Sequence, residues 1–102
     1  MILLVAALLA QATSEPVDQE ITVMGARLQA LSVMLGRDAR GKLACNLSAS
    51  SGNAGVDEQL CKTAARCFKQ GAVENAAMHA CIDARKPAIL EDFAARVRAR
   101  QS

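Results

Sequence analysis

The fold of this chain is decided by one stretch, residues 43–81, which reads LACNLSASSGNAGVDEQLCKTAARCFKQGAVENAAMHAC. It holds all four cysteines of the chain, at Cys45, Cys61, Cys67 and Cys81. The gaps between them are wider than those of the close cysteine pairs in structural zinc sites, and no pair has the two-residue gap of a redox-active motif. An even number of cysteines in a small chain that meets oxidising conditions predicts two disulfides instead.

The N-terminus indicates that the chain meets such conditions. Residues 2–10 are apolar throughout, and Ala10-Gln11-Ala12 has the small residues of a cleavage site. The apolar run is shorter than the roughly twenty residues of a membrane-spanning helix, but it suits the hydrophobic region of a secretory signal. We therefore expect residues 1–12 to be a signal peptide cleaved after Ala12, and the mature protein to be periplasmic or secreted. The alternative is a buried N-terminal helix or strand.

The remaining residues suffice for one domain, which we expect over residues 20–102 after a flexible linker at residues 13–19. The domain has few large apolar side chains with which to fill a core, because Phe68 and Phe93 are the only aromatic residues and alanine dominates the apolar content. In the chain-entropy model, two disulfides that close loops of about twenty residues each contribute about 3 kcal/mol. We expect the disulfides to be structural.

The first half of the domain is expected to form strands. Residues 20–24 alternate polar and apolar side chains and are rich in β-branched residues, so they predict a short strand that ends at Gly25. Residues 42–49 also alternate, with Leu43, Cys45 and Leu47 on one face, and residues 29–36 are the expected hairpin partner across a turn. A helix through Met24, Leu28, Leu31 and Leu35 is the alternative for part of this region.

The second half is expected to be helical, beyond a loop at residues 50–55. Residues 56–70 repeat apolar side chains at helical spacing, with Asp57 and Glu58 in the first turn and Gly71 just past the end. A second helix is expected over residues 73–85, and Pro87 suits the first turn of a third, basic helix. The predicted class is α+β: a small antiparallel sheet of two or three strands, then two or three helices, stapled by disulfides.

The geometry of these elements favours one cysteine pairing among three. If the strand of residues 43–49 runs antiparallel to the first helix, Cys45 lies level with Cys67. If the two following helices fold about Gly71, Cys61 and Cys81 lie level, whereas Cys67 and Cys81 are offset by roughly 9 Å, too far for a disulfide. The expected pairs are Cys45–Cys67 and Cys61–Cys81.

Residues 43–67 place a strand before Ser50-Ser51-Gly52 and then a helix bearing Val56-Asp57, Leu60 and Arg66. This order resembles part of the C-terminal domain of TonB-type energy transducers, although the four cysteines and the helical tail depart from that domain. Residues 20–27, EITVMGAR, resemble the start of outer-membrane receptor plugs, which bind TonB by strand addition. The whole pattern is similar to small exported proteins of alphaproteobacteria, which implies a Gram-negative periplasm and no particular activity.

No cluster of residues predicts catalysis, a metal or a cofactor. His79 is the only histidine, without a recognisable nucleophile or orienting partner. Asp57 and Glu58 are explained by the helix dipole, and residues 50–53 lack the spacing of a phosphate-binding loop. Basic residues without interleaved aromatic residues argue against nucleic-acid binding, and no small-molecule substrate is evident.

Two functions remain as expectations. The first is a non-catalytic protein-binding or adaptor module that pairs an unknown partner with an edge strand at Ile21, Thr22, Val23 and Met24. The second is a structural or stress-related envelope protein whose basic C-terminal helix contacts a membrane surface or an acidic partner. Residues 85–102 carry a net charge of +3 and the rest of the chain a net charge of −1, which together give the chain's net charge of +2.

Overall fold

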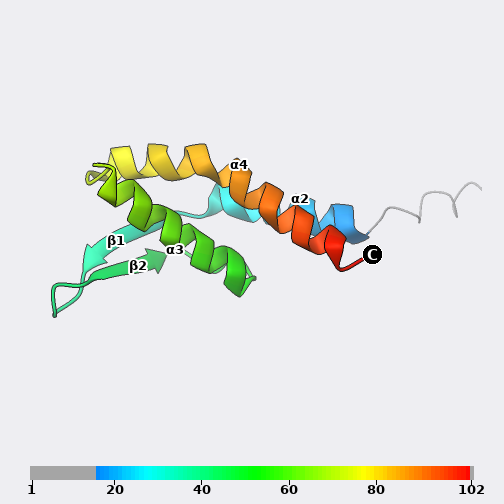
Figure 1. Cartoon of the computed structure of the whole chain (residues 1–102), viewed down its shortest axis with the longest axis horizontal. Helices are drawn as coiled ribbons and strands as arrows, with labels where there is room; N and C mark the ends of the chain where they lie inside the picture. Colours follow the sequence, from blue (N-terminus) through cyan, green and yellow to red (C-terminus); the bar gives the residue numbers. More distant parts are fainter. Residues whose placement is uncertain (1–15, 102) are drawn as a thin grey trace, which may run out of the picture.

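A computed structural model describes residues 16–101. The expected signal peptide at residues 1–12 lies outside this range. The elements, labelled as in Figure 1, are one helix, a hairpin and two further helices. In chain order they are α2 (Pro16–Ala30), β1 (Val33–Arg37), β2 (Leu43–Leu47), α3 (Ala54–Lys69) and α4 (Asn75–Ala99). The α+β class is confirmed, with a two-stranded antiparallel sheet, but a helix also precedes the sheet.

The hairpin is confirmed, but its first strand begins at Val33, because residues 29–30 of the expected strand lie in α2. β1 and β2 pair antiparallel, with Val33 opposite Leu47 and Arg37 opposite Leu43. Asp38 closes the turn, because its Oδ1 accepts hydrogen bonds from the backbone N–H groups of Arg40 and Lys42 at 2.8 and 3.0 Å. These hydrogen bonds fix the turn between β1 and β2, and the geometry of a hairpin turn sets the register in which its two strands pair.

The first helix after the hairpin, α3, also follows the prediction. Asn53 caps its start by accepting a hydrogen bond from the N–H of Val56 at 3.0 Å. At its end Gly71 has a φ of +103°, and the N–H of Ala72 returns to the carbonyl of Cys67 at 2.9 Å. A left-handed glycine with this backward bond is a common helix stop.

The expected strand at residues 20–24 is wrong, and so is the linker from Pro16 onward, because these residues lie in α2. Val17, Met24 and Leu28 are buried and Ile21 is half-buried, so the burial repeats at helical spacing. Pro16 suits the first turn of a helix. The stripe packs on α4, and this packing outweighs the local β propensity of the β-branched residues.

The expected break between two C-terminal helices is also wrong, because α4 runs through Pro87. A proline inside a helix removes one backbone hydrogen bond and bends the helix, and Figure 1 shows α4 changing direction near its middle. Buried side chains continue on both sides of the proline: Met78, Ile82, Ile89, Phe93 and Val97. The cost of the proline is offset because one apolar stripe packs on two different partners.

Through this stripe α4 is the central element of the fold, since it contacts α2, α3 and β1. α3 packs against α4 and covers one face of the sheet, whereas α2 packs against α4 alone among the elements. Figure 1 shows α2 beside the C-terminal half of α4, with the hairpin and α3 toward its N-terminal half. Leu28, Val56, Leu60 and Val97 are the largest apolar side chains that are almost fully buried.

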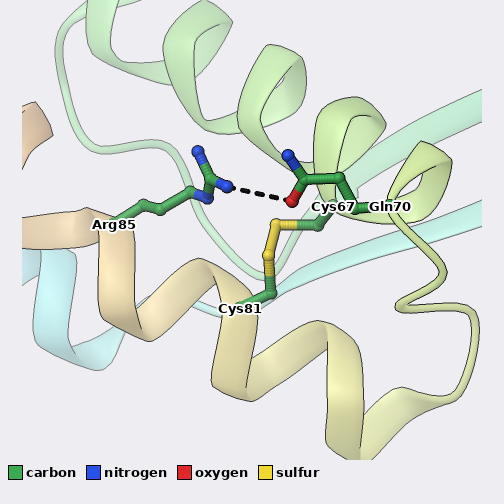
Figure 2. Close-up of a disulfide and its surroundings, with 4 residues drawn as sticks. All are labelled: Cys67, Gln70, Cys81 and Arg85. Atoms are coloured by element: carbon green, nitrogen blue, oxygen red, sulfur yellow. Dashed lines mark hydrogen bonds between the residues drawn. A yellow bond between two sulfur atoms is a disulfide. The ribbon is translucent and has the colours of Figure 1, made fainter.

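All four cysteines are disulfide-bonded, but the expected pairing is wrong. The bonds are Cys45–Cys61 and Cys67–Cys81, with Cα atoms 5.7 and 6.1 Å apart. The first joins β2 to α3; the second joins α3 to α4 and lies beside a hydrogen bond of 3.0 Å from Arg85 Nη2 to Gln70 Oε1 (Figure 2). Such disulfides are typical of an oxidising, non-cytoplasmic compartment.

The pairing argument failed because it treated the connections as sharp folds. β2 ends at Leu47 and α3 begins at Ala54, so the segment between them is a turning loop and not an extended strand. Cys45 therefore lies only two residues before the end of β2, opposite the second turn of α3. Likewise, the connection between α3 and α4 spans residues 70–74, which shifts the level at which the two helices meet.

Candidate partner-binding edge

The outer edge of β2 presents unpaired backbone groups. Hydrogen bonds flank the ladder at both ends: Ser48 N–H donates to Ser32 O, and Asp38 N–H donates to Lys42 O, each at 2.9 Å. In an antiparallel pair, hydrogen-bonded and non-hydrogen-bonded positions alternate. The residues whose backbone N–H and C=O groups hydrogen-bond between β1 and β2 are therefore the even-numbered ones of each strand.

The odd-numbered residues of β2 consequently direct their N–H and C=O groups away from β1. These are Leu43, Cys45 and Leu47. Within residues 16–101, β2 packs on β1 and α3 only, and the sheet has no third strand. The other edge of the sheet is less open, because β1 lies near the beginning of α4, where Val33 and Leu35 line a small hollow with Val73 and Met78.

The side chains of the edge differ between its two faces. Cys45 and Leu47 are half-buried and pack toward α3, while Leu43 is 38% exposed at the far end. Ala44 and Asn46 point to the opposite face, which no described helix covers. β2 contains no charged residue and no proline, the devices by which sheet edges are commonly protected from pairing.

The Cys45–Cys61 disulfide holds the middle of this edge against α3. Leu35 and Leu47 add apolar contacts to the core on either side of it. An edge fixed in an extended conformation before binding loses less conformational freedom when another strand pairs with it.

The loop after β2 is fixed by the carboxylate of Asp57. Ser51 donates to Oδ1 through its N–H at 2.8 Å and through Oγ at 2.6 Å, and Ser50 Oγ donates to Oδ2 at 2.6 Å. Partial burial of Asp57 raises its pKa, but the hydrogen bonds from both serines outweigh this effect and hold the pKa below its usual value. Asp57 therefore works as a structural acceptor in its ionised form.

The same loop also ties α2 to α3. Arg27 Nη1 donates to the carbonyl of Ser51 at 2.9 Å. Gly52 permits this approach, because its φ is +88° and a Cβ there would lie 2.5 Å from Arg27 Nη1. The N–H of Gly52 is taken by Ser50 Oγ at 3.0 Å. Since both the Ser51 and Gly52 N–H groups are paired within the loop, it does not offer a nest for an anion.

A groove of about 730 Å³ runs between α2 and α4. Its walls include Ile21, Leu28 and Leu90, and Pro87 lies along it. At one end Lys86 is anchored: its Nζ donates to the carbonyl of Leu31 at 2.8 Å and pairs with Asp83 at 3.0 Å. The groove thus has an apolar lining, and its one lysine is already engaged.

The site residues expected from the sequence are not brought together as a strand edge. Ile21, Thr22, Val23 and Met24 lie inside α2, so their backbone groups are committed to the helix; Met24 is buried and Val23 is 48% exposed. His79 is exposed on α4. Across residues 16–101, no three or more His, Cys, Asp or Glu side chains are grouped to hold a metal ion.

The edge at β2 was missed as a site although its strand and its inward face were predicted. The signal that could have found it is the absence of charge in residues 43–47 of a strand that borders a loop. None of the helices among the described residues is both long and apolar enough to cross a membrane.

Comparison of the chain with protein-family models, with curated proteins and with solved structures finds no match.

Proposed function

We propose that this protein is a non-catalytic protein-binding module, which binds an extended segment of its partner by strand addition at the outer edge of β2. One observation carries the proposal: the N–H and C=O groups of Leu43, Cys45 and Leu47 point away from β1, and no described element covers them. Main-chain hydrogen bonds provide affinity in this mode, and side chains next to the edge provide specificity.

The side chains indicate what kind of segment fits. On the α3 side, the added strand lies beside Leu43 and Leu47, so apolar residues at alternate positions suit it. On the uncovered side it lies beside Ala44 and Asn46, where small or polar residues suit it. Each backbone hydrogen bond contributes about 0.5–1.5 kcal/mol net, so a strand that uses all the outward groups binds with moderate affinity.

We further propose that the protein works in the periplasm or is secreted after cleavage of residues 1–12. Two disulfides support an oxidising compartment, and the apolar run followed by Ala10-Gln11-Ala12 supports an export signal.

The alternative, an envelope protein that contacts membranes through its basic C-terminus, has less support. Arg96 is paired with Asp92 on the same helix, and Arg100 is paired with Glu20 of α2 at 3.2 Å. The pKa of Asp92 is held below its usual value by hydrogen bonds from Arg96 and Gln59. Part of the positive charge is thus balanced within the molecule.

The proposal can be tested with a display library of nine-residue peptides, selected on the oxidised protein. We expect the selected peptides to slow amide hydrogen exchange at Leu43, Cys45 and Leu47 and to bind at least tenfold more weakly to the variant Leu43→Pro. That variant removes one outward N–H at the first residue of the strand, where proline is tolerated. Leu43→Thr, which keeps the N–H, is the matched control.

Peptides that bind Leu43→Pro as tightly as the wild type, or that protect no amide of β2, would refute strand addition at this edge.

A further inference from the structure

The β2 edge has a sequence that can pair with itself. When two copies of residues 43–47 are laid antiparallel, Cys45 lies opposite Cys45 of the second copy, and Leu43 lies opposite Leu47 of the second copy. These are the residues whose backbone groups point outward, so every outward group of one edge meets an outward group of the other. Antiparallel registers shifted by two residues pair fewer of them.

The charges near the edge are compatible with this register. Lys42, the charged residue nearest to the strand, lies opposite Ser48 of the second copy, and no like charges meet within the paired residues. On the uncovered face, Ala44 lies opposite Asn46 of the second copy. Directly opposed like charges would oppose pairing, and this register has none.

The helices above the sheet also fit. α3 packs on both β1 and β2, so it is set back from the outer edge. Because the two copies present the same face of β2, both copies of α3 lie on one face of the joined sheet. Cys61 and Ala65, both half-buried, lie on α3 one turn apart, and Cys61 is held over β2 by its disulfide.

From these observations we infer that the partner at the β2 edge is a second copy of this chain, paired through β2 about a two-fold axis at Cys45. The dimer has one four-stranded antiparallel sheet in place of two hairpins. A two-stranded sheet is marginal by itself, and sheets of four or more strands are the common size. The inference rests on the proposed function, because it uses the same edge and names its occupant.

Charged residues introduced on the uncovered face of β2 test the register of the dimer without disturbing the core. The double variant Ala44→Lys/Asn46→Lys places two lysine pairs directly opposite each other in the dimer, while Ala44→Lys/Asn46→Glu places lysine opposite glutamate twice. Within one hairpin these positions face only Gly36 and Met34, so neither variant creates a charged pair across the hairpin of a single copy.

Sedimentation equilibrium of the oxidised protein over a wide concentration range gives the measurement. We expect the wild type to dimerise, the Lys/Lys variant to dimerise about tenfold more weakly, and the Lys/Glu variant to dimerise at least as tightly as the wild type. Leu43→Pro should be monomeric. Thermal unfolding of each variant shows whether it is folded, and the two charge variants remain informative if the proline variant is not.

A wild type that stays monomeric overturns the inference; if selected peptides still protect the β2 amides, the proposed function stands and the partner is a different protein. A dimer that is indifferent to Leu43→Pro and to both charge variants forms elsewhere, and this result also overturns the inference. So does a Lys/Glu variant that dimerises as weakly as the Lys/Lys variant. Failure of both dimerisation and peptide binding would remove the proposed function as well.

Discussion

Removal of each disulfide separately should reveal how the two bonds stabilise the fold. The double variants Cys45→Ala/Cys61→Ala and Cys67→Ala/Cys81→Ala each open one closed loop. The sequence separations are 16 and 14 residues, so the chain-entropy model gives nearly equal losses of about 3 kcal/mol.

Packing makes the two losses unequal. The side chain of Cys67 is completely buried, while those of Cys45 and Cys61 are half-buried. Replacement of a buried sulfur by hydrogen leaves a small cavity, which adds about 1 kcal/mol for a group the size of one methylene. We therefore expect Cys67→Ala/Cys81→Ala to lose about 4 kcal/mol and Cys45→Ala/Cys61→Ala about 3 kcal/mol.

Urea unfolding followed by circular dichroism measures these free energies. The wild type treated with reductant serves as the reference without disulfides. A loss below about 1 kcal/mol for either variant would refute the entropic reasoning, and a larger loss at Cys45–Cys61 would refute the assignment of the extra term to burial.

Accessibility also orders the reduction of the bonds, because an attacking thiolate must reach the sulfur; Cys45–Cys61 should open first under limiting reductant, as peptide mapping after alkylation would show.

Three further predictions concern side chains away from the disulfides. Lys86→Met should cost about 1–3 kcal/mol in urea unfolding, because it leaves the carbonyl of Leu31 without its 2.8 Å donor; Lys62→Met, in an exposed ion pair, should change stability by less than about 0.5 kcal/mol, and equal losses would contradict the role of Lys86. Gly25→Ala should stabilise α2 by up to about 1 kcal/mol, since its Cβ would lie 3.3 Å from a leucine side chain of α4 that borders the open groove and can shift; a lower melting temperature would show that this side chain cannot move. Asp57 has a lowered pKa in the folded state, so its stabilisation is present above the unfolded-state pKa of about 3.9 and is lost as the pH falls through the lower folded value; unfolding measured from pH 6 to pH 2 should show a shallower pH dependence for Asp57→Asn, and an unchanged slope would rule out this linkage.

Local patterns in the sequence were sufficient where neighbouring residues determine the structure. The alternation of residues 42–49 predicted the hairpin, and the helical spacing of residues 56–70 with Gly71 just past its end predicted α3. The outward-facing backbone of β2 follows from the same alternation once the sheet is known to have two strands. That number depends on residues distant in the chain, so the absence of charge in residues 43–47 indicates a candidate edge but does not by itself show that no third strand covers it.

Local patterns misled where distant packing decides. Ile21, Thr22 and Val23 have β propensity, but the stripe of Val17, Met24 and Leu28 meets α4 and enforces a helix across Gly25. The disulfide pairing depended on where each element ends, and small errors at Leu47 and in the connection after α3 moved the expected partner by almost two helical turns.

The location of the cross-links has a consequence for how the molecule opens. Both disulfides lie among β2, α3 and the first part of α4, whereas α2 contains no cysteine. It is held only by non-covalent contacts, including its packing on α4, the hydrogen bond from Lys86 of α4 to Leu31 O, and the hydrogen bond from Arg27 to Ser51 O in the loop before α3. Partial unfolding should therefore begin at α2 and the last turns of α4, with the hairpin still held in place by covalent rings. The strand that we expect to recruit a partner would then remain competent in a half-melted molecule, so heat or denaturant should abolish the slow-exchanging amides of α2 before it abolishes association.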